Sequence, residues 1–478
     1  MKPTTKDALN LLMQGSMVLA RMEHHGIAID EAYLEKTISE VSQQITQMTG
    51  ELKQDEFWRV WRKRWGEKAN IGSDHQLTTV LFDVLKLPYP EGEEWRTHTG
   101  RYRADEEMIG RLKLPFCKSW RRLKKLQRLR GTYLHGIRRE VLNGRVHASA
   151  HLHTVETYRS SYSDPNLQNA YNRDPEMKDL LRRCYVPSEG CVLVEVDFST
   201  IEVRVGCARH KDPTMMEYMR DASKDMHRDT AAELYSLPVK FLIEHKDWAK
   251  KHVRDWSKNR FVFPQFYGSV WFQCAPDLWE QVAAGALMPD GETTVKAHLK
   301  SQGIKKLGRC KAGEEPEPGS FGERVREVEK SFWDVRFPVY TAWKKKTYEN
   351  YLECGYIDTL TGFRLAGHYR RNEVLNSDIQ GSSFHCLLWS MIEIVNSELR
   401  RRRMKARLVA EIHDSMLIDA PIRELQDILH IAKEVMIVRL PKAWSWINVP
   451  METESEICEE NWAGKVVWVE NNGIWGPK

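Results

Sequence analysis

Two short apolar segments that each end in an aspartate constrain the fold of this chain more than any other feature. Residues 191–196 (Cys-Val-Leu-Val-Glu-Val) lead to Asp197, and residues 407–412 (Arg-Leu-Val-Ala-Glu-Ile) lead to His413 and Asp414. Short runs rich in β-branched residues are typical of buried strands. Another apolar run follows Asp414, which indicates a hairpin with an acid at its turn. We expect one sheet to bring the two aspartates side by side.

Two carboxylates at the edge of a sheet form a candidate magnesium site. Mg²⁺ takes oxygen ligands, keeps several waters and is usually completed by substrate phosphates. Two such ions about 4 Å apart stabilise the attacking and leaving oxygens of a phosphoryl displacement. Considered alone, the two strands are also compatible with isolated surface acids at turns, so the residues around the aspartates must decide.

The composition is that of a folded protein. The chain has 478 residues, a net charge of +5, 41% hydrophobic and 10% aromatic residues, whereas disordered chains combine high net charge with few aromatics. At roughly 150 residues per domain, this length allows about three domains or lobes.

The 9 cysteines are scattered without a C-x-x-C pair, which argues against a zinc site or disulfides and favours a reducing, cytoplasmic location. No run is apolar enough for a signal peptide or a membrane span, so we expect neither secretion nor a membrane partner.

Two segments combine aromatic and basic residues, as nucleic-acid-binding surfaces do. They are 57–65 (Phe-Trp-Arg-Val-Trp-Arg-Lys-Arg-Trp) and 120–130, in which six cations flank a narrow leucine seam. A solvated helix face is the alternative for each. Helical spacing of apolar residues marks 6–60, 212–275 and 322–352, whereas 276–321 carries the Pro and Gly signals of a loop.

The residues around the two aspartates match motifs of a known family. Asp197-Phe-Ser-Thr-Ile-Glu202-Val-Arg204 resembles D-Y-S-Q-I-E-L-R, the first motif of family A (DNA polymerase I-like) DNA polymerases, and Ile412-His413-Asp414-Ser415 resembles V-H-D-E, the third. Arg254-Asp-Trp-Ser-Lys258 and Phe263-Pro-Gln-Phe-Tyr267-Gly268 resemble the second. Further stretches match in the same order at 19–30, 71–82, 163–169, 225–232, 355–362 and 376–381. Because so many motifs follow in register, the chain is identified as a member of this family.

The resemblance implies an α+β fold, the right-hand polymerase fold with an antiparallel-sheet palm, a helical thumb and helical fingers. It divides the chain into 1–30 as a palm and thumb lead-in, 31–140 as thumb, 141–205 as palm with the first motif, 206–350 as fingers with the second motif and an insertion around 276–321, and 351–478 as palm with the third motif. The three domain equivalents are then lobes of one unit.

The resemblance also implies a role for each motif residue. Asp197 and Asp414 would hold the metal, with the backbone carbonyl of Phe198 as a further ligand, and Lys258 would join them in catalysis. The residues expected to bind the dNTP are Arg254, Lys258, His227, Glu202, Phe263 and Tyr267, with Glu202 excluding a 2′-hydroxyl and Phe263 stacking on the base. The residues expected to contact DNA are Arg159, Asn166, Gln168, Asn169, Gln380 and His413. Amides and Arg suit the minor groove, where every base pair offers similar acceptors.

These roles imply a template-directed DNA-dependent DNA polymerase that extends a primer 3′-hydroxyl with dNTPs by two-metal-ion nucleotidyl transfer. Two Mg²⁺ ions are the expected cofactors, with Mn²⁺ as a substitute, and primer–template DNA is the expected partner of a monomer. The polymerase pattern begins by Leu19, so we expect no proofreading exonuclease in the chain and a viral or phage-like enzyme that relies on a separate exonuclease or other replication proteins. A single-subunit RNA polymerase and a non-catalytic nucleic-acid-binding subunit are the alternatives.

The chain departs from the family pattern at four places. Lys258 lies nine residues before Tyr267 where the family has eight, so either the helix carries a one-residue bulge or Arg254 and Lys258 are shifted by one. Ser415 replaces the usual acid after Asp414, which leaves fewer carboxylates near the metal. Tyr158 replaces a glycine, and residues 276–321 exceed the usual length of the fingers connection without an assignable function.

Overall fold

The computed structural model describes residues 3–89, 96–168 and 174–478. The α-helices are α1 (Thr5–His25), α2 (Glu31–Gln54), α3 (Glu56–Trp65), α4 (Asp74–Thr78), α5 (Glu106–Arg111), α6 (Pro115–Arg128), α7 (His135–Glu140), α8 (Pro175–Arg182), α9 (Ile201–His210), α10 (Pro213–Arg220), α11 (Met226–Leu234), α12 (Val239–Glu244), α13 (Lys246–Ala249), α14 (Asp255–Ser257), α15 (Phe263–Phe266), α16 (Trp271–Ala283), α17 (Val295–Ser301), α18 (Phe321–Lys330), α19 (Pro338–Cys354), α20 (Arg371–Ile392), α21 (Leu425–Lys433) and α22 (Leu440–Ala443). The strands are β1 (Ile27–Ile29), β2 (Val141–Leu142), β3 (Arg145–Val146), β4 (Ser149–His151), β5 (Ser161–Ser163), β6 (Tyr185–Val186), β7 (Cys191–Phe198), β8 (Tyr356–Asp358), β9 (Arg364–Ala366), β10 (Arg407–Ile412), β11 (Ser415–Pro421), β12 (Thr453–Cys458), β13 (Lys465–Asn471) and β14 (Ile474–Pro477).

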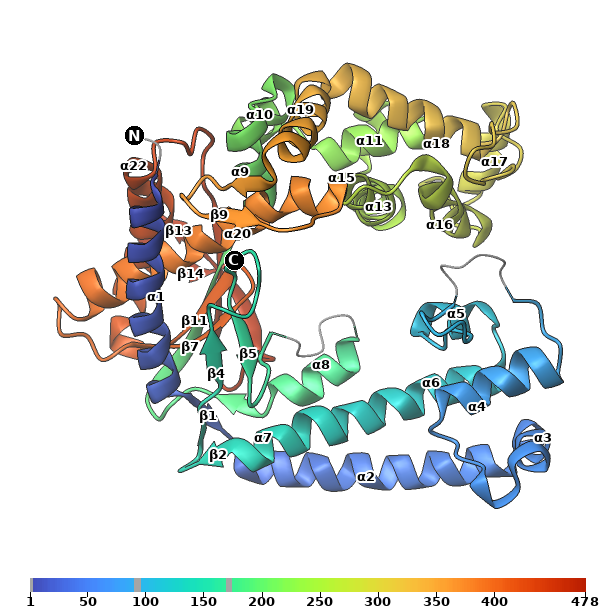
Figure 1. The fold of residues 1–478 in the computed structure, drawn as a ribbon, viewed down its shortest axis with the longest axis horizontal. Coiled ribbons are helices and arrows are strands. Elements are labelled where there is room, and N and C mark those ends of the chain that lie inside the picture. Colours follow the sequence, from blue (N-terminus) through green and yellow to red (C-terminus); the bar gives the residue numbers. More distant parts are fainter. Residues whose placement is uncertain (1–2, 90–95, 169–173) are drawn as a thin grey trace.

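A six-stranded sheet forms the base of the molecule, which we call the palm. Its strand order is β10-β11-β7-β12-β13-β14, and every neighbouring pair is antiparallel. The central strand β7 is buried from Val192 to Val196, because it lies between two other strands and beneath α21. Helix α1 packs against β10 and α20 (Figure 1). This sheet positions both strand-end aspartates.

Two long helices, α2 and α6, form an arm that we call the thumb (Figure 1). Leu34, Val41 and Ile45 of α2 are buried, as are Leu123 and Leu126 of α6, so each helix turns one apolar face toward the other. Helices α3, α4 and α5 lie at the far end of this arm. The basic residues of α6 are therefore on the faces that α2 leaves uncovered.

A third lobe, the fingers, is built from α10 to α19 around a hydrophobic core of its own. It lies above the thumb in Figure 1 and contacts the palm through α9, α19 and α20. One sequence expectation is wrong here: helix α16 continues through Pro276 to Ala283, so the loop begins later than residue 276 and is interrupted by α17. Pro276 is tolerated because helical packing of Cys274, Ala275 and Leu278 against the fingers core outweighs one lost hydrogen bond.

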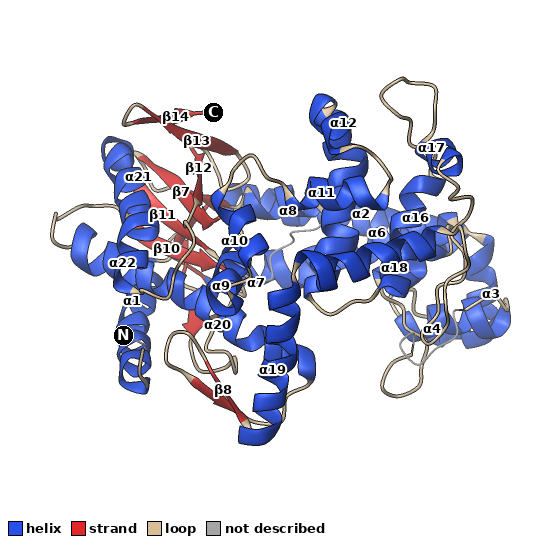
Figure 2. Ribbon diagram, turned by 90° about the horizontal axis from the view of Figure 1, so that it is seen from above, coloured by secondary structure: helices blue, strands red, loops and turns tan. Residues whose placement is uncertain are grey.

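The palm sheet lies at one end of the molecule with α1, α21 and α22 beside it, and the helices of the thumb and fingers extend toward the other end (Figure 2). Within the described ranges, no helix has both the length and the apolar character needed to cross a membrane. All 9 cysteines are free thiols.

Candidate active site

The palm sheet brings the two strand-end aspartates together. Ser415, the residue after Asp414, is the direct partner of Asp197 in the β7–β11 register. The backbone N–H of Phe198 donates to the carbonyl oxygen of Asp414 at 3.3 Å. His413 adopts a left-handed backbone conformation (φ 61°) that closes the tight turn between β10 and β11. The two aspartates are therefore neighbours, although 217 positions of sequence separate them.

Burial and mutual repulsion make these two carboxyl groups hard to ionise. Burial, then Asp414, then Glu195 raise the pKa of Asp197 to about 7. Burial likewise raises the pKa of Asp414. The Oδ1 atom of Asp197 is buried and, among the described residues, has no hydrogen-bond donor. A bound cation would satisfy this atom and relieve the repulsion, so the residues fit a divalent metal.

The two aspartates are a partial ligand set for such a metal. Within the described part of the chain, no group of three or more His, Cys, Asp or Glu side chains is arranged to hold an ion. Phe198 is the last residue of β7 and follows Asp197 directly. Mg²⁺ is commonly held by one or two carboxylates and completed by waters and phosphates, so this site suits a cation that arrives with a phosphate-bearing substrate.

The second-motif residues of the fingers contact the start of α11, where Asp225 and His227 lie. Arg254 Nε lies 2.5 Å from Asp225 Oδ2, and its Nη1 lies 3.0 Å from Asp255. Lys258 Nζ stands 5.2 Å from the centre of the Phe263 ring, which also makes an edge contact with His227 at 5.7 Å. Among the described residues, Lys258 forms no ion pair and the Nδ1 of His227 has no hydrogen-bond partner. Burial and Arg254 lower the pKa of His227 to about 4.

The structure resolves the spacing problem in this motif. Residues 258–262 form a π-helical turn, which accommodates one extra residue between Lys258 and the aromatic positions. A second π-helical turn, at 250–254, precedes it. Phe263 begins the following α15, and Tyr267 ends it. Of the two explanations for the spacing, the one-residue bulge is therefore present in the structure.

Glu202 lies between a cation and a phenol near the two aspartates. Its carboxylate is 3.7 Å from Arg159 Nη1, and Tyr267 donates its hydroxyl proton to Glu202 Oε2 at 3.2 Å. Burial and then Glu202 raise the pKa of Tyr267, which keeps this phenol protonated. The bond joins α9 of the palm to the end of α15 in the fingers, so Glu202 is fixed from both lobes.

The expected DNA-contacting residues lie in three places. Gln168 and Arg159 lie near the turn that carries His413, whose pKa is lowered by burial and by Arg159. Gln380 is half-buried on α20, and Asn166 precedes Gln168 in a loop. Asn169 lies outside the described residues.

Sequence reasoning missed two buried glutamates beside this site. Glu411 of β10 accepts hydrogen bonds from Ser160 and, at 3.3 Å, from the Gln168 amide. Glu195 of β7 lies 3.3 Å from the Ser415 hydroxyl. Each is an acid inside an otherwise apolar strand segment, and that is the sequence signal by which both could have been found, because a buried carboxylate requires a partner.

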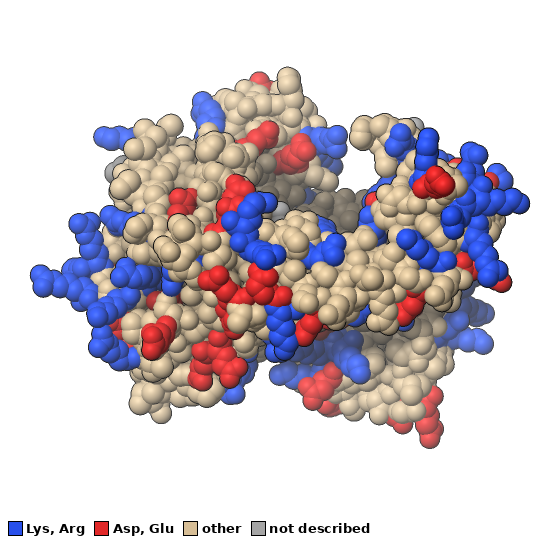
Figure 3. Space-filling model, turned by 90° about the horizontal axis from the view of Figure 1, so that it is seen from below, with Lys and Arg blue, Asp and Glu red and all other residues tan. Residues whose placement is uncertain are grey.

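A groove of about 2020 Å³ separates the thumb from the fingers and ends near Gln168 and His413. Basic side chains outnumber acidic ones along it; they are Lys113, Arg121, Lys124, Lys125, Arg128, Lys251 and Arg260. Trp120, Tyr133 and Trp256 add aromatic surface. Figure 3 shows Lys and Arg side chains gathered at the end of the molecule that carries α3. The groove thus has the charge and ring content that suit a polyanion.

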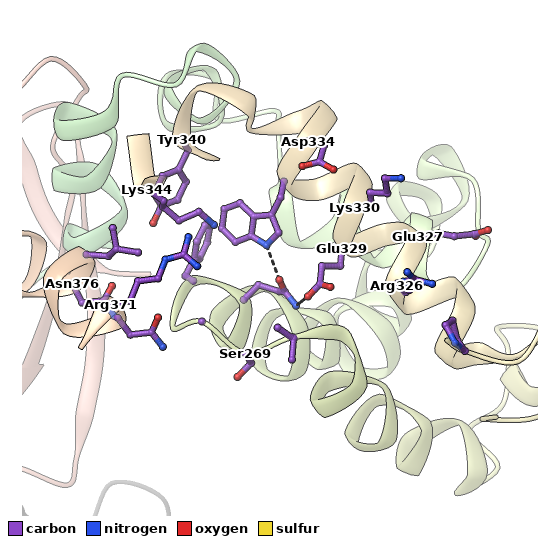
Figure 4. Close-up of a pocket in the computed structure, with 18 of the residues that line it drawn as sticks. Ser269, Arg326, Glu327, Glu329, Lys330, Asp334, Tyr340, Lys344, Arg371 and Asn376 are labelled. Carbon is purple, nitrogen blue, oxygen red and sulfur yellow. Dashed lines mark hydrogen bonds between the residues drawn. The ribbon is translucent and has the colours of Figure 1, made fainter. Parts of the chain in front are cut away.

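A second pocket, of about 770 Å³, adjoins Gly268 at the end of the second motif (Figure 4). Gln265 anchors its wall by donating to Glu329 at 2.6 Å and accepting from the Trp333 indole at 2.7 Å. Lys344 Nζ lies 3.0 Å from the centre of the Trp333 ring, and burial lowers its pKa to about 8. Acidic and basic side chains nearly balance in the lining, so this pocket has no preference for an anion.

The palm sheet with its paired aspartates, the helical arm and the helical lobe opposite it together define the right-hand polymerase fold. Comparison with solved structures agrees: the POL domain of Pol1 from M. smegmatis, solved in complex with DNA primer-template and dNTP, matches with a TM-score of 0.72 and 23% identity, over 95% of this chain and 70% of that one. The chain belongs to DNA polymerase family A, whose family model matches residues 33–284 and 325–464. The unmatched segment between these ranges overlaps the insertion expected from the sequence.

Curated relatives share this family at low identity. A thermostable DNA polymerase I of Thermus thermophilus is 27% identical over 460 residues, which is 93% of this chain and 47% of that protein. A DNA polymerase I of Lactococcus lactis is 26% identical over 422 residues, which is 88% of this chain and 42% of that protein. The chain spans about half the length of the curated relatives it matches.

Proposed function

We propose that this chain is a template-directed DNA-dependent DNA polymerase that extends a primer 3′-hydroxyl with deoxynucleoside triphosphates. Family membership supports the proposal, but one observation carries it: Asp197 and Asp414 are adjacent on the palm sheet, and the pKa of each is raised. Among the described residues, no hydrogen-bond donor reaches Asp197 Oδ1. Such a pair has little purpose in the protein alone and is completed by a cation.

In this proposal Asp197, Asp414 and the Phe198 carbonyl hold two divalent ions, Mg²⁺ or Mn²⁺. When bound, such ions supply Lewis-acid stabilisation of the charge on the attacking and leaving oxygens. The remaining work falls to the fingers. Lys258 and Arg254 would bind the triphosphate. Among the described residues Lys258 has no competing ion pair, and Arg254 has more N–H groups than its bonds to Asp225 and Asp255 use. Lys258 is also placed to neutralise the departing pyrophosphate.

The sugar and base would be selected by the residues around Glu202. Its carboxylate is held by Arg159 and Tyr267, so it cannot move aside for a 2′-hydroxyl without breaking both contacts. This favours deoxynucleotides over ribonucleotides. Phe263 stands between Lys258 and His227, where its ring can stack on the nucleotide whose phosphates they bind.

The groove between thumb and fingers would hold the primer–template. Its cations neutralise backbone phosphates without reading sequence, as a polymerase requires. We also propose that the polymerase region itself has no exonuclease activity; degradation of a primed template without nucleotides that is lost in Asp197→Ala would contradict this. Proofreading would then need a different chain or domain.

A primer-extension assay tests the function. Wild type is given primed template with dNTPs or rNTPs and Mg²⁺, beside Asp414→Ala and, as a matched control, Glu460→Ala on an exposed palm position. We expect stepwise dNTP extension by wild type and by the control, and none by Asp414→Ala. Preferred use of rNTPs would instead support an RNA polymerase. DNA binding without extension would support a non-catalytic subunit.

A further inference from the structure

A buried glutamate lies beside the position where this chain lacks the family's acid. The third motif has an acid after its aspartate, whereas this chain has Ser415. Glu195 lies two residues before Asp197 on β7, so both side chains point to the same face of the sheet as Ser415 does. The Ser415 hydroxyl is 3.3 Å from Glu195 Oε1 and 3.1 Å from the Ile412 carbonyl oxygen. Ser415 and Glu195 are 4% and 7% exposed, respectively.

Glu195 is also held by groups on the same face of the sheet, on the side of β7 away from β11. Lys465 Nζ and Trp462 Nε1 both lie 2.6 Å from its Oε2 atom. Oε2 is therefore fully engaged, and Oε1 is the atom that remains for Ser415. A buried ion pair of this kind adds little stability by itself, so its position next to the aspartates calls for a reason.

We propose that Glu195 is a positioning residue for the paired aspartates and supplies, from β7, the carboxylate that the family pattern carries at position 415. It acts through Ser415: the hydrogen bond ties the first residue of β11 to β7, and so fixes Asp414 relative to Asp197. Glu195 is not itself a metal ligand, because Lys465 and Trp462 occupy one of its oxygens and Ser415 the other. The proposal rests on the proposed function in that the aspartates must bind a cation.

A purely structural ion pair is the competing explanation, and the chain offers a matched control for it. Lys465 also lies 2.6 Å from Glu456, the residue opposite Glu195 on β12. Glu456→Gln removes one carboxylate from Lys465, as Glu195→Gln does, but among the described residues the Ser415 hydroxyl bonds to Glu195 and Ile412 and not to Glu456. A structural role predicts similar effects of both substitutions, whereas a positioning role predicts a clearly larger effect of Glu195→Gln on the metal.

Binding of Mn²⁺ alone, followed by electron paramagnetic resonance without DNA or nucleotide, tests the proposal independently of activity. We expect Glu195→Gln and Ser415→Ala each to weaken Mn²⁺ binding about 10-fold, as loss of outer-shell partners does, and Glu456→Gln, whose charge acts on Asp197 less than that of Glu195 does, to have a clearly smaller effect. The double variant should bind no more weakly than Glu195→Gln. Unchanged binding in Glu195→Gln, equal effects in Glu456→Gln, or single effects that multiply to about 100-fold would each overturn the proposal.

A charge swap keeps the test decisive if single variants are poorly folded. Ser415→Glu in the wild-type background places two carboxylates in one buried space and should lower both thermal stability and Mn²⁺ affinity. Combined with Glu195→Ala, the same substitution should restore both, and failure to exceed Glu195→Ala alone would refute the proposal. Wild type that binds Mn²⁺ no better than Asp197→Ala would overturn the metal site itself and with it the proposed function.

Discussion

The buried carboxyl group of Glu411 makes the stability of the palm depend on pH in a way that one substitution removes. Glu411 is 0% exposed and lies three residues before Asp414. Burial raises its pKa to about 8 from an ordinary value of 4.5, although Ser160, Arg159 and Gln168 lower it in part. The group is therefore protonated in the folded protein at neutral pH and ionised in the unfolded chain. Glu411→Gln keeps the shape and removes the titration.

The sign and size of the effect follow from these two pKa values. Because the folded state holds the proton more tightly, the free energy of unfolding falls as pH rises from about 4.5 to about 8 and then levels. At about 1.4 kcal/mol per pH unit, the full loss is about 5 kcal/mol. Between pH 6 and pH 9 the wild type should lose about 3 kcal/mol that the Gln variant keeps.

Guanidinium unfolding of both proteins at pH 6 and pH 9 measures this difference. Each protein is compared with itself, so hydrogen bonds altered by the substitution and titrations common to both proteins cancel. Infrared spectroscopy gives a second measurement, since between pH 7 and pH 9 wild type should lose a larger carbonyl band of protonated carboxyl groups than the variant, in which Asp197 but not Glu411 contributes to that band. Equal pH slopes in the two proteins would refute the assignment of a neutral Glu411.

Three further predictions concern the fingers and thumb. Asp225→Ala removes the carboxylate that holds Arg254 at 2.5 Å. Because the guanidinium is then no longer held in position for the triphosphate, the KM for dNTP should rise about 10-fold in steady-state extension. An unchanged KM would argue against Arg254 as a triphosphate ligand. Tyr267→Phe removes the 3.2 Å hydrogen bond to Glu202, worth about 1 kcal/mol, and competition assays should show about fivefold weaker discrimination against rNTPs. Trp120→Phe removes the indole bond to the α3–α4 loop and should destabilise the thumb by about 2 kcal/mol in thermal melts, without altering dNTP discrimination.

Local sequence patterns predicted the palm well because its strands have strong local signals. The segment expected to be a strand, 191–196, lies within β7, and the expected hairpin is β10–β11. The sequence also predicted that these strands lie in one sheet, because the backbone N–H and C=O groups of buried strands need hydrogen-bond partners. Counting residues in the second motif predicted either a one-residue bulge or a shift of Arg254 and Lys258, and the structure has a π-helical turn at 258–262.

Other features could not be predicted because they depend on register and packing between distant elements. Which strand faces Glu195, and therefore that Lys465 and Ser415 are its partners, follows from the β7–β11 and β7–β12 registers, which no local pattern contains. The interaction of Glu411 with Ser160 likewise joins residues 251 positions apart. Pro276 was misread as a loop signal because its local helix-breaking tendency is overridden by burial of its neighbours in the fingers core.

The charge distribution explains why the palm, rather than the fingers or thumb, carries the acids. Four carboxyl groups, those of Glu195, Asp197, Glu411 and Asp414, are held within one rigid sheet, and burial raises the pKa of three of them. A site of this kind retains protons until a metal cation arrives, so cation binding and proton release are coupled.

The Lys and Arg side chains of the groove lie on helices of the thumb and fingers, some with π-helical turns. A sheet can keep like charges close because each strand is fixed by two neighbours, whereas ligand-binding helices can move toward an incoming polyanion. The net charge of +5 therefore hides a separation of charge that the proposed reaction requires.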